Sequence, residues 1–351
     1  MDDSNQAALS RSTVLVTGAA GYIGSHAVTE LLRQGCRVVA VDNYSNSSSE
    51  VYARIERLAG ASFVRAEVDV RDDAALDKLL SQHRVDACIH FAALKSVSES
   101  MAQPLRYLDN NVGGLLTLLR VLRKHGVQGF VFSSSATVYG DPVRVPVPEV
   151  ASLNAVSVYG ATKLMGEKIL QQLTAITPEF ERPWRVVVLR YFNPVGAHPS
   201  GQIGEAPRGV PNNLMPCVAQ VAAGLRPKLN IFGDTYPTPD GTCVRDYIHI
   251  QDLVAGHVAA LRHLLGDGAS LTLNLGTGLG TSVRQLVETF MQVNGVAVPY
   301  EVVAPRAGDV AQCFADPSLA HQVLGWRAHH DLADMCRDAW RWQCSRPRSH
   351  A

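Results

Sequence analysis

The sequence predicts an α/β fold in which a doubly wound, mostly parallel sheet is joined to a smaller mixed α/β lobe. Strand-like runs alternate with helical patterns through the first half of the chain, as a parallel sheet requires. A glycine-rich turn follows the first strand, and an aspartate closes the second. After residue 190 the alternation stops and proline and glycine become frequent, which is typical of a loop-rich second lobe.

Composition limits the classes of function. The 351 residues fit one large domain or two modest ones, and 46% hydrophobic with 18% charged residues indicates a globular protein. Lys+Arg and Asp+Glu both number 32, so no net field favours nucleic acid or a membrane surface. No apolar run approaches the roughly 20 residues that span a bilayer. We therefore expect neither nucleic-acid nor membrane partners.

The seven cysteines are scattered and include no C-x-x-C pair. This pattern indicates reduced thiols and a cytoplasmic protein, and it favours neither a disulfide framework nor a metal site. Residues 1–11 are polar, carry two aspartates and do not resemble a signal peptide. We expect them to form a flexible tail.

The first elements form a dinucleotide-binding arrangement. Residues 13–17 are a β-branched run, a helical pattern extends to about Arg33, and residues 37–41 form a second strand that Asp42 closes. The turn between the first strand and the helix reads Gly18-Ala-Ala-Gly21-Tyr-Ile-Gly24. Its spacing, G-x-x-G-x-x-G, resembles that of the extended short-chain dehydrogenase/reductase superfamily.

The physical reason for this arrangement is direct. Glycines let the backbone approach a pyrophosphate, which then lies at the helix N-terminus. The carboxylate of Asp42 can bond a ribose 2′-hydroxyl and would repel a 2′-phosphate. The sequence therefore predicts NAD rather than NADP, bound to a Rossmann sheet.

Further strands and helices continue the alternation. Strand-like runs lie at 62–66, 87–90, 129–132 and 185–189. Helical patterns lie near 72–83 and 104–125, and then near 215–224, 252–265 and 282–293. We assign residues 12–190 to the Rossmann domain and 191–345 mainly to the second, substrate-binding lobe. One later strand, 271–275, is placed to return to the main sheet.

Small and polar residues follow the strands, where ligands of such sheets bind. Asp69 and Val70 follow the third strand, and Phe91, Ala92, Lys95 and Asn110 follow the fourth. Loop or capping chemistry would explain any one of them. Their repeated placement at strand ends favours cofactor contact.

The strongest chemical signal is a serine run followed by a Tyr-x-x-x-Lys pair. Ser133, Ser134 and Ser135 end the fifth strand, and Tyr159 and Lys163 lie one helical turn apart on one face. A serine can orient a substrate hydroxyl, a tyrosine can take its proton, and an ammonium favours the phenolate. Lowering a tyrosine pKa from about 10 to neutrality needs roughly 4 kcal/mol, of which Lys163 supplies only part. A nicotinamide cation would be a second source.

A series of longer motifs makes a resemblance specific. They are GAAGYIGSH, VDNYSNS, HFAALKSV, FSSSATVYGD, VYGATK, LRYFNPVGAHPSG, PNNLMP and VRDYIHIQDL, and the resemblance spans residues 13 to 345. The chain resembles the UDP-glucose 4-epimerase (UDP-galactose 4-epimerase) family. That resemblance implies an isomerase that inverts C4 of UDP-glucose and UDP-galactose through a 4-keto intermediate, by transient hydride transfer to tightly bound NAD. It also implies a role in galactose metabolism and a homodimer.

The resemblance assigns site residues by position. The catalytic residues are Ser135, Tyr159 and Lys163. The adenosine diphosphate half of NAD is expected at Gly18, Gly21, Tyr22, Ile23, Gly24, Asp42, Asn43, Asn46, Ser47, Asp69 and Val70. The inner part of NAD is expected at Phe91, Ala92, Lys95, Asn110, Ser133, Tyr159, Lys163 and Tyr191. The UDP-sugar is expected at Ser135, Tyr159, Phe192, Asn193, Asn213, Leu214, Asn230, Phe232, Arg245, Arg306, Asp309 and Cys313.

One departure from the pattern of the family bears on the substrate. Some family members carry a large tyrosine where this chain has Cys313, and the bulky residue is associated with exclusion of 2-acetamido sugars. We therefore expect UDP-GlcNAc and UDP-GalNAc as further substrates, although a small buried cysteine without a role in selection is the alternative.

Sugar-nucleotide 4,6-dehydratases place an Asp-Glu pair after the catalytic hydroxyl, where this chain has Ala136 and Thr137.

Other functions remain as alternatives. Another NAD-dependent sugar-nucleotide epimerase or a dehydratase would share the superfamily signals. A non-catalytic NAD-binding sensor would be expected to lack a member of the Ser-Tyr-Lys set, and all three are present.

Overall fold

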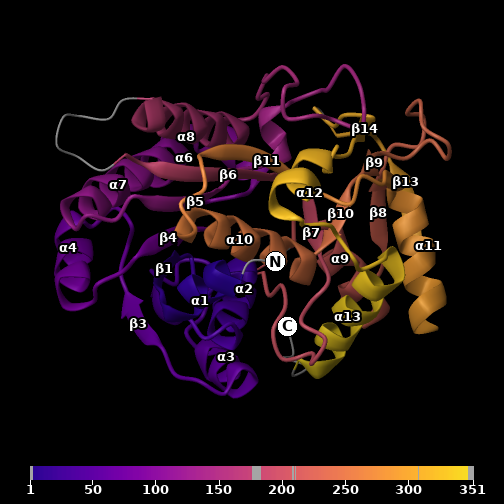
Figure 1. Ribbon diagram of the computed structural model, residues 1–351. Helices are drawn as coiled ribbons and strands as arrows, with labels where there is room; N and C mark the ends of the chain where they lie inside the picture. The colour runs from indigo at the N-terminus through magenta and orange to yellow at the C-terminus, as the bar shows by residue number, and fades with distance from the viewer. Residues whose placement is uncertain (1–2, 176–182, 208, 210, 307, 347–351) are drawn as a thin grey trace.

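The computed structural model describes residues 3–175, 183–207, 209, 211–306 and 308–346 (Figure 1). Its main sheet has seven strands in the order β11-β6-β5-β4-β1-β2-β3, and every neighbouring pair is parallel. This order confirms the predicted doubly wound parallel sheet. The strands are β1 (Thr13–Thr17), β2 (Arg37–Asp42), β3 (Val64–Glu67), β4 (Ala87–His90), β5 (Gly129–Ser133), β6 (Arg185–Tyr191) and β11 (Leu271–Leu275).

Helices cover both faces of the main sheet. Val14 and Val16 of β1 point into one buried cluster, and Leu15 points into another on the opposite face. Each strand buried on both faces therefore reads as a continuous apolar run. The first face carries α1 (Asp3–Arg11), α2 (Tyr22–Arg33), α3 (Val51–Ala59) and α10 (Ile250–Leu265), and the second carries α4 (Asp73–Gln82), α7 (Gly114–Lys124) and α8 (Val158–Ala175).

In the part of the chain that the structure describes, none of the helices combines the length and apolar character that a bilayer crossing requires.

The amino-terminal segment differs from the prediction. A flexible tail was expected over residues 1–11, and the structure instead contains the helix α1 over Asp3–Arg11. Leu9 is fully buried in the cluster that α2 and α10 share, and α1 packs on α10. One apolar anchor in a polar segment is too weak a sequence signal to predict a docked helix. Residues 1 and 2 lie outside the described residues.

The helix predicted over residues 104–125 is divided into three segments. They are α6 (Pro104–Tyr107), the π-helix η1 (Leu108–Gly113) and α7. Two further short helices near the sheet edge, α5 (Val97–Ala102) and the 3-10 turn η2 (Ala136–Val138), were not predicted. The π-helix places Asn111 toward α8, as described below, and π segments occur frequently at functional sites.

The second lobe is built from small sheets and helices around its own core. The strand pairs are β7 (Asn193–Val195) with β10 (Tyr247–His249), and β8 (Leu229–Phe232) with β13 (Tyr300–Val303). The three-stranded sheet contains β12 (Thr281–Ser282), β9 (Val244–Arg245) and β14 (Gln312–Cys313). The helices α9 (Leu214–Ala222), α11 (Val283–Asn294) and α13 (Leu332–Ser345) lie on the right of Figure 1, away from β1 and α4.

The boundary at residue 190 does not separate two independent units. The helix α10 packs on β5, β6 and α2, and β11 pairs in parallel with β6 at the edge of the main sheet. The helix α12 (Ser318–Leu324) then packs on β11. The return of the strand predicted over residues 271–275 to the main sheet is thereby confirmed.

Candidate active site

The turn between β1 and α2 brings the glycines against the loop that follows β4. Gly18 has a φ of +68°, and a Cβ at this position would lie 2.7 Å from the backbone nitrogen of Ala92. A Cβ on Gly24 would overlap the carbonyl oxygen of Gly18. Both positions thus exclude a side chain, and the N-terminus of α2 is left open to an anion. This cradle fits the pyrophosphate of a dinucleotide.

Asp42 lies at the end of β2 beside the glycine turn and is 7% exposed. Its carboxylate accepts hydrogen bonds from the backbone N–H of Ala20 (2.9 Å), the backbone N–H of Tyr44 (2.9 Å) and the hydroxyl of Ser47 (2.7 Å). Two carboxylate oxygens can accept about four bonds in total, so capacity remains for a ribose hydroxyl. The position and charge of Asp42 fit the prediction of NAD.

The neighbouring predicted residues line the same edge of the sheet. Asn43 donates to Asp69 (2.9 Å), and Arg71 bonds to Asp69 as well. These bonds, that of Arg71 foremost, hold the pKa of Asp69 well below its ordinary value. Val70 is buried against Gly114, and Asn46 is exposed.

The predicted inner cofactor residues lie around the loop after β4. The ring of Phe91 lies 4.8 Å from that of His257, and Tyr191 lies 5.8 Å from the same ring. Asn110 donates to the side-chain oxygen of Asn111 (2.9 Å). The ammonium of Lys95 contacts Glu205 instead, at 2.9 Å.

Tyr22 and Ile23 begin α2 but direct their side chains away from the glycine turn. The hydroxyl of Tyr22 donates to the carbonyl oxygen of Gly196 in the second lobe, at 2.7 Å. Ile23 packs against the buried cluster of the first face.

The three predicted catalytic residues meet at the end of β5. Ser135, Tyr159 and Lys163 are 7%, 8% and 4% exposed. Ser135 caps η2, where its hydroxyl oxygen accepts from the backbone N–H (3.2 Å) and the hydroxyl (3.0 Å) of Thr137. Ser135 also lies close enough to Tyr159 to lower the pKa of its phenol. Lys163 donates through Nζ to the carbonyl oxygen of Ser133, at 2.7 Å.

Burial dominates the proton affinities of this set. Burial raises the pKa of Tyr159 to about 12, and the nearby hydroxyl of Ser135 lowers this pKa by a smaller amount. Burial lowers the pKa of Lys163 to about 8, and the charge of Glu167 opposes that change. At neutral pH the lysine therefore stays largely protonated and the tyrosine keeps its proton.

Three buried polar residues that support the set were missed by the sequence reasoning. Asn111 on η1 donates to the hydroxyl of Thr162 (3.0 Å) on α8 and exchanges two bonds with the backbone of Leu94. Ser100 on α5 accepts from the backbone N–H of Tyr159, at 3.1 Å. His257 on α10 bonds the hydroxyl of Ser133, at 2.9 Å. No local pattern marks these residues, because each partner comes from another element.

Three of the predicted residues of the second lobe, Phe232, Asp309 and Cys313, lie beside two predicted arginines. The guanidinium of Arg306 lies 3.6 Å from the centroid of the Phe232 ring, and Arg245 lies 3.8 Å from the carboxylate of Asp309. Cys313 is the register partner of Arg245 between β14 and β9. Local positive charge thus occurs in a chain of zero net charge, and it suits an anionic ligand.

Cys313 contacts both Arg245 and the segment that follows Ser135. It is 8% exposed and shares a buried cluster with Phe192, and with Val138 and Tyr139 just beyond Ser135. Burial raises the pKa of its thiol to about 11, so it is not a reactive thiolate. Its small side chain packs where the two lobes meet.

The remaining predicted residues are more scattered. Asn213 precedes α9 and donates to Glu205, at 2.6 Å, and Leu214 begins α9 and packs on the core of the lobe. Asn193 and Asn230 are exposed on β7 and β8. Glu205, which the sequence reasoning did not identify, therefore joins Lys95 of the main domain to Asn213 of the lobe.

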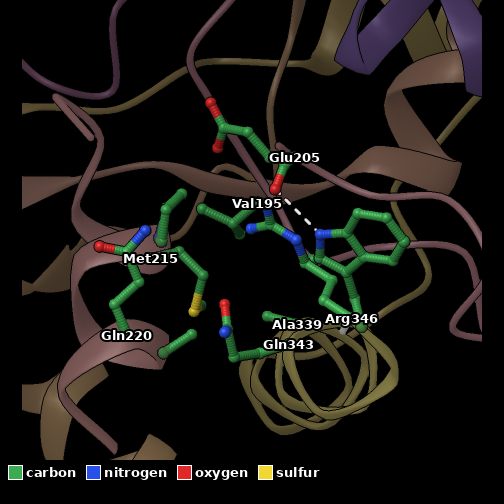
Figure 2. Close-up of a pocket in the computed structure, with 11 residues that line it drawn as sticks. Val195, Glu205, Met215, Gln220, Ala339, Gln343 and Arg346 are labelled. Atoms are coloured by element: carbon green, nitrogen blue, oxygen red, sulfur yellow. Dashed lines mark hydrogen bonds between the residues drawn. The ribbon is translucent and has the colours of Figure 1, made fainter. Parts of the chain in front are cut away.

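A separate pocket between α9 and α13 is not part of the predicted site (Figure 2). Its wall includes Met215, Glu205 and Trp342, and the indole N–H of Trp342 donates to the carbonyl oxygen of Glu205, at 2.9 Å. Its lining residues are outside the predicted NAD and UDP-sugar sets.

Comparison with known proteins agrees with this geometry. A family model described as GDP-mannose 4,6 dehydratase matches residues 15–339. A UDP-glucose 4-epimerase from Dictyostelium discoideum is 51% identical over 339 residues, which cover 96% of this chain and 97% of the relative. The chain belongs to the UDP-glucose 4-epimerase family. The resemblance predicted from the sequence motifs is thereby confirmed.

Solved structures of this family have the same fold. The UDP-glucose-4-epimerase of Stenotrophomonas maltophila, with bound NAD and formylated UDP-arabinopyranose, is 53% identical, has a TM-score of 0.92, and the match covers 95% of this chain and 98% of that one. The UDP-glucose 4-epimerase of Bifidobacterium longum, in complex with NAD+ and UDP, is 45% identical with a TM-score of 0.90, and the match covers 95% and 98%. Both hold NAD, in agreement with the predicted cofactor.

The glycine turn generates a test with a matched control. Gly18 and Gly60 both have positive φ, +68° and +66°, but a Cβ on Gly60 would meet nothing within 4 Å. We expect Gly60→Ala to cost about 1–2 kcal/mol in unfolding free energy and to leave NAD content unchanged. Gly18→Ala has the same backbone cost plus the clash with Ala92, so it should be less stable and purify without NAD. Urea unfolding and absorbance of the released cofactor measure both, and equal NAD content in the two variants would contradict the assignment of the cradle.

Proposed function

We propose that this chain interconverts UDP-glucose and UDP-galactose by inverting C4 of the hexose, with NAD as a retained cofactor. The observation that supports this most directly is the buried convergence of Ser135, Tyr159 and Lys163 at the same sheet edge as the glycine turn. The family to which the chain belongs carries this activity in its name. The alternatives are another NAD-dependent sugar-nucleotide epimerase or a dehydratase.

Each member of the set has a distinct role. Tyr159 takes the proton of the C4 hydroxyl and later returns it, and Ser135, which lies beside Tyr159, orients that hydroxyl. Lys163 keeps a positive charge near the developing phenolate while its bond to Ser133 fixes its position. When bound, NAD would supply a hydride acceptor for C4, returning the hydride to the opposite face, and a positive charge that favours ionised Tyr159.

The residues of the second lobe anchor the nucleotide. Arg245 and Arg306 are placed to make charge-assisted bonds to a diphosphate, since a guanidinium can donate two parallel bonds. An anchor at the diphosphate leaves the sugar free to present either face of C4 to the same base. Elimination of water lacks support, because Ala136 and Thr137 offer no acid-base pair after Ser135.

Turnover without added NAD tests the proposed function. Protein purified without the cofactor and incubated with UDP-galactose should form UDP-glucose, followed by nuclear magnetic resonance. Tyr159→Phe removes the base and should lower kcat by about 10²- to 10⁴-fold. Tyr300→Phe, at a tyrosine that is 40% exposed on β13, is the matched control and should keep full activity. A folded wild-type protein that is inactive even with NAD supplied would contradict the proposal.

We further propose that 2-acetamido sugars are accepted. The support is the small side chain of Cys313, which packs with Phe192 beside the catalytic segment, where a larger residue would fill more of the shared space. The N-acetyl group of UDP-GlcNAc or UDP-GalNAc requires such space.

Two substitutions at Cys313 test this substrate range. Cys313→Tyr should abolish epimerisation of UDP-GlcNAc while UDP-galactose is still converted. Cys313→Ala should convert both, because it adds no volume. Coupled assays on the two substrates measure the ratio of kcat/KM values, and unchanged UDP-GlcNAc activity in Cys313→Tyr would refute the idea.

A homodimer is proposed through an apolar helix face. Met101, Leu105, Leu116 and Met165 are 59%, 78%, 44% and 43% exposed and lie on α5, α6, α7 and α8. The helices α5, α6 and α8 contact one another, and α6, α7 and α8 lie together at the upper left of Figure 1. A second copy of the chain would cover this face, since stable interfaces bury about 800 Å² per partner.

The oligomeric state tests this face. Wild-type protein should elute as a dimer in size-exclusion chromatography with light scattering, and Leu105→Glu with Met165→Glu should yield a monomer because two charges would enter the interface. Leu279→Glu changes an apolar residue that is 70% exposed elsewhere and should stay dimeric. A monomeric wild type, or a dimeric double variant, would exclude this interface.

A cytoplasmic location is proposed from the thiols. Cys36, Cys88, Cys243 and Cys313 are buried without disulfide partners. Reducing compartments keep such thiols in this state.

A further inference from the structure

A buried ion pair adjoins the serine segment of the candidate active site and has no part in the roles assigned above. Arg190, near the end of β6, donates to Glu167 on α8 through Nε (3.0 Å) and Nη2 (2.6 Å). The two side chains are 6% and 8% exposed. Removing two ions from water costs several kcal/mol for each, so a pair at this depth is a weak contributor to stability. Its neighbours indicate a different role.

The carboxylate of Glu167 holds the centre of the serine segment. The hydroxyl of Ser134 donates to Oε1 of Glu167, and the backbone N–H of Ser134 donates to the carbonyl oxygen of Leu189, at 2.8 Å. Ser134 lies between Ser133, whose carbonyl oxygen accepts from Lys163, and Ser135, whose hydroxyl acts on the phenol of Tyr159. Fixing Ser134 therefore fixes both neighbours that contact the Tyr-Lys pair.

Glu167 also acts on Lys163 through its charge, one turn further along α8. Burial lowers the pKa of Lys163 to about 8, and Glu167 raises it. Burial keeps nearby His90 neutral at physiological pH, with a pKa lowered to about 3. Among the described residues, Glu167 of α8 and His90 of β4 interact electrostatically with the ammonium, and the ring centroid of Phe132 on β5 lies 5.1 Å from Nζ. On β6, Arg190 faces Glu167 and Tyr191 interacts with Tyr159.

Arg190 extends the same network to the buried cluster that contains Phe192 and Cys313. Its Nη1 donates to the hydroxyl of Tyr139 (3.1 Å), which in turn donates to the side-chain oxygen of Asn274 (2.7 Å) on β11. Tyr139 packs in the cluster that contains Phe192 and Cys313. The ion pair of Arg190 and Glu167 thus connects the serine segment with the buried cluster that contains Phe192 and Cys313.

We propose that Glu167 is a positioning residue for the reaction: it holds Ser134 so that Ser133 and Ser135 face Lys163 and Tyr159, and it supports the positive charge of Lys163. Arg190 balances the charge of Glu167 and connects this arrangement to Tyr139. The inference rests on the proposed function, because positioning is defined relative to the proton transfer at Tyr159.

Glu167→Gln is the central variant, since it keeps the size of the side chain and an acceptor for Ser134 but removes the charge. The neutral amide no longer pairs with the buried Arg190, so we expect α8 and the serine segment to shift. A shift of about an ångström commonly lowers kcat roughly 10²-fold, here with little change in KM. Loss of the negative charge lowers the pKa of Lys163. The alkaline decline of the kcat–pH profile should therefore move to lower pH.

The state of Lys163 is measured directly and without turnover. In protein labelled with ¹³C at the lysine ε-carbon, the resonance that is missing from Lys163→Met reports the titration of this ammonium. A lower pKa in Glu167→Gln than in wild type supports the inference. Equal pKa values in the two folded proteins overturn the charge role.

Two further variants keep the test decisive, because Glu167→Gln leaves Arg190 without its counter-charge. Glu167→Gln with Arg190→Gln removes both charges and replaces the first variant if that protein does not fold. Ser134→Ala removes only the hydroxyl and should lower kcat while leaving the fold intact. The matched control is Ser12→Ala, at a buried serine whose hydroxyl donates to the carbonyl oxygen of Leu9 (2.7 Å) at the far end of β1, and it should keep full activity.

The outcomes separate this inference from the proposed function. An inactive wild type contradicts the proposed function, while the titration of Lys163 still tests the influence of Glu167. An active wild type with unchanged kcat in folded Glu167→Gln and Ser134→Ala overturns the positioning role alone.

Discussion

One buried hydrogen bond, from the ammonium of Lys163 to the carbonyl oxygen of Ser133, sets the geometry of the site. A buried ammonium needs a partner, and this partner is the last residue of β5, so the bond fixes α8 against the edge of the main sheet. Tyr159 lies one turn away on the same face and is thereby brought to Ser135. Asn111 of η1 donates to Thr162, next to Lys163, so a second hydrogen bond from another element holds the same part of α8.

The main sheet was predictable because its signals are local. The buried runs, the glycine turn and Asp42 specify strand, turn, helix and strand within a few consecutive residues, and the structure places β1, α2 and β2 within about one residue of the prediction. The errors occur where distant contacts decide the structure. The helix α1 depends on the burial of Leu9 under α10, and the π-helix η1 forms where Asn111 reaches α8 and Leu94. Neither contact leaves a periodic trace in the sequence.

The site was predictable to the extent that residue type and strand-end position identify it. Ser135, Tyr159 and Lys163 were found in this way, and they converge in the structure. Glu167, Glu205 and His257 were not found, because their partners lie far away in the sequence: Ser134 is 33 residues from Glu167, and Lys95 is 110 residues from Glu205. A buried carboxylate on a helix looks like an exposed one until the opposite element is known.

The return of α10 and β11 to the main sheet determines how this protein can be divided. A fragment ending at residue 190 would expose the edge of β6 that β11 covers, and it would uncover the apolar face on which α10 packs. An unpaired strand edge beside exposed apolar surface is a template for aggregation. The first 190 residues therefore do not form an autonomous module, because β11 and α10 complete the sheet on which they depend.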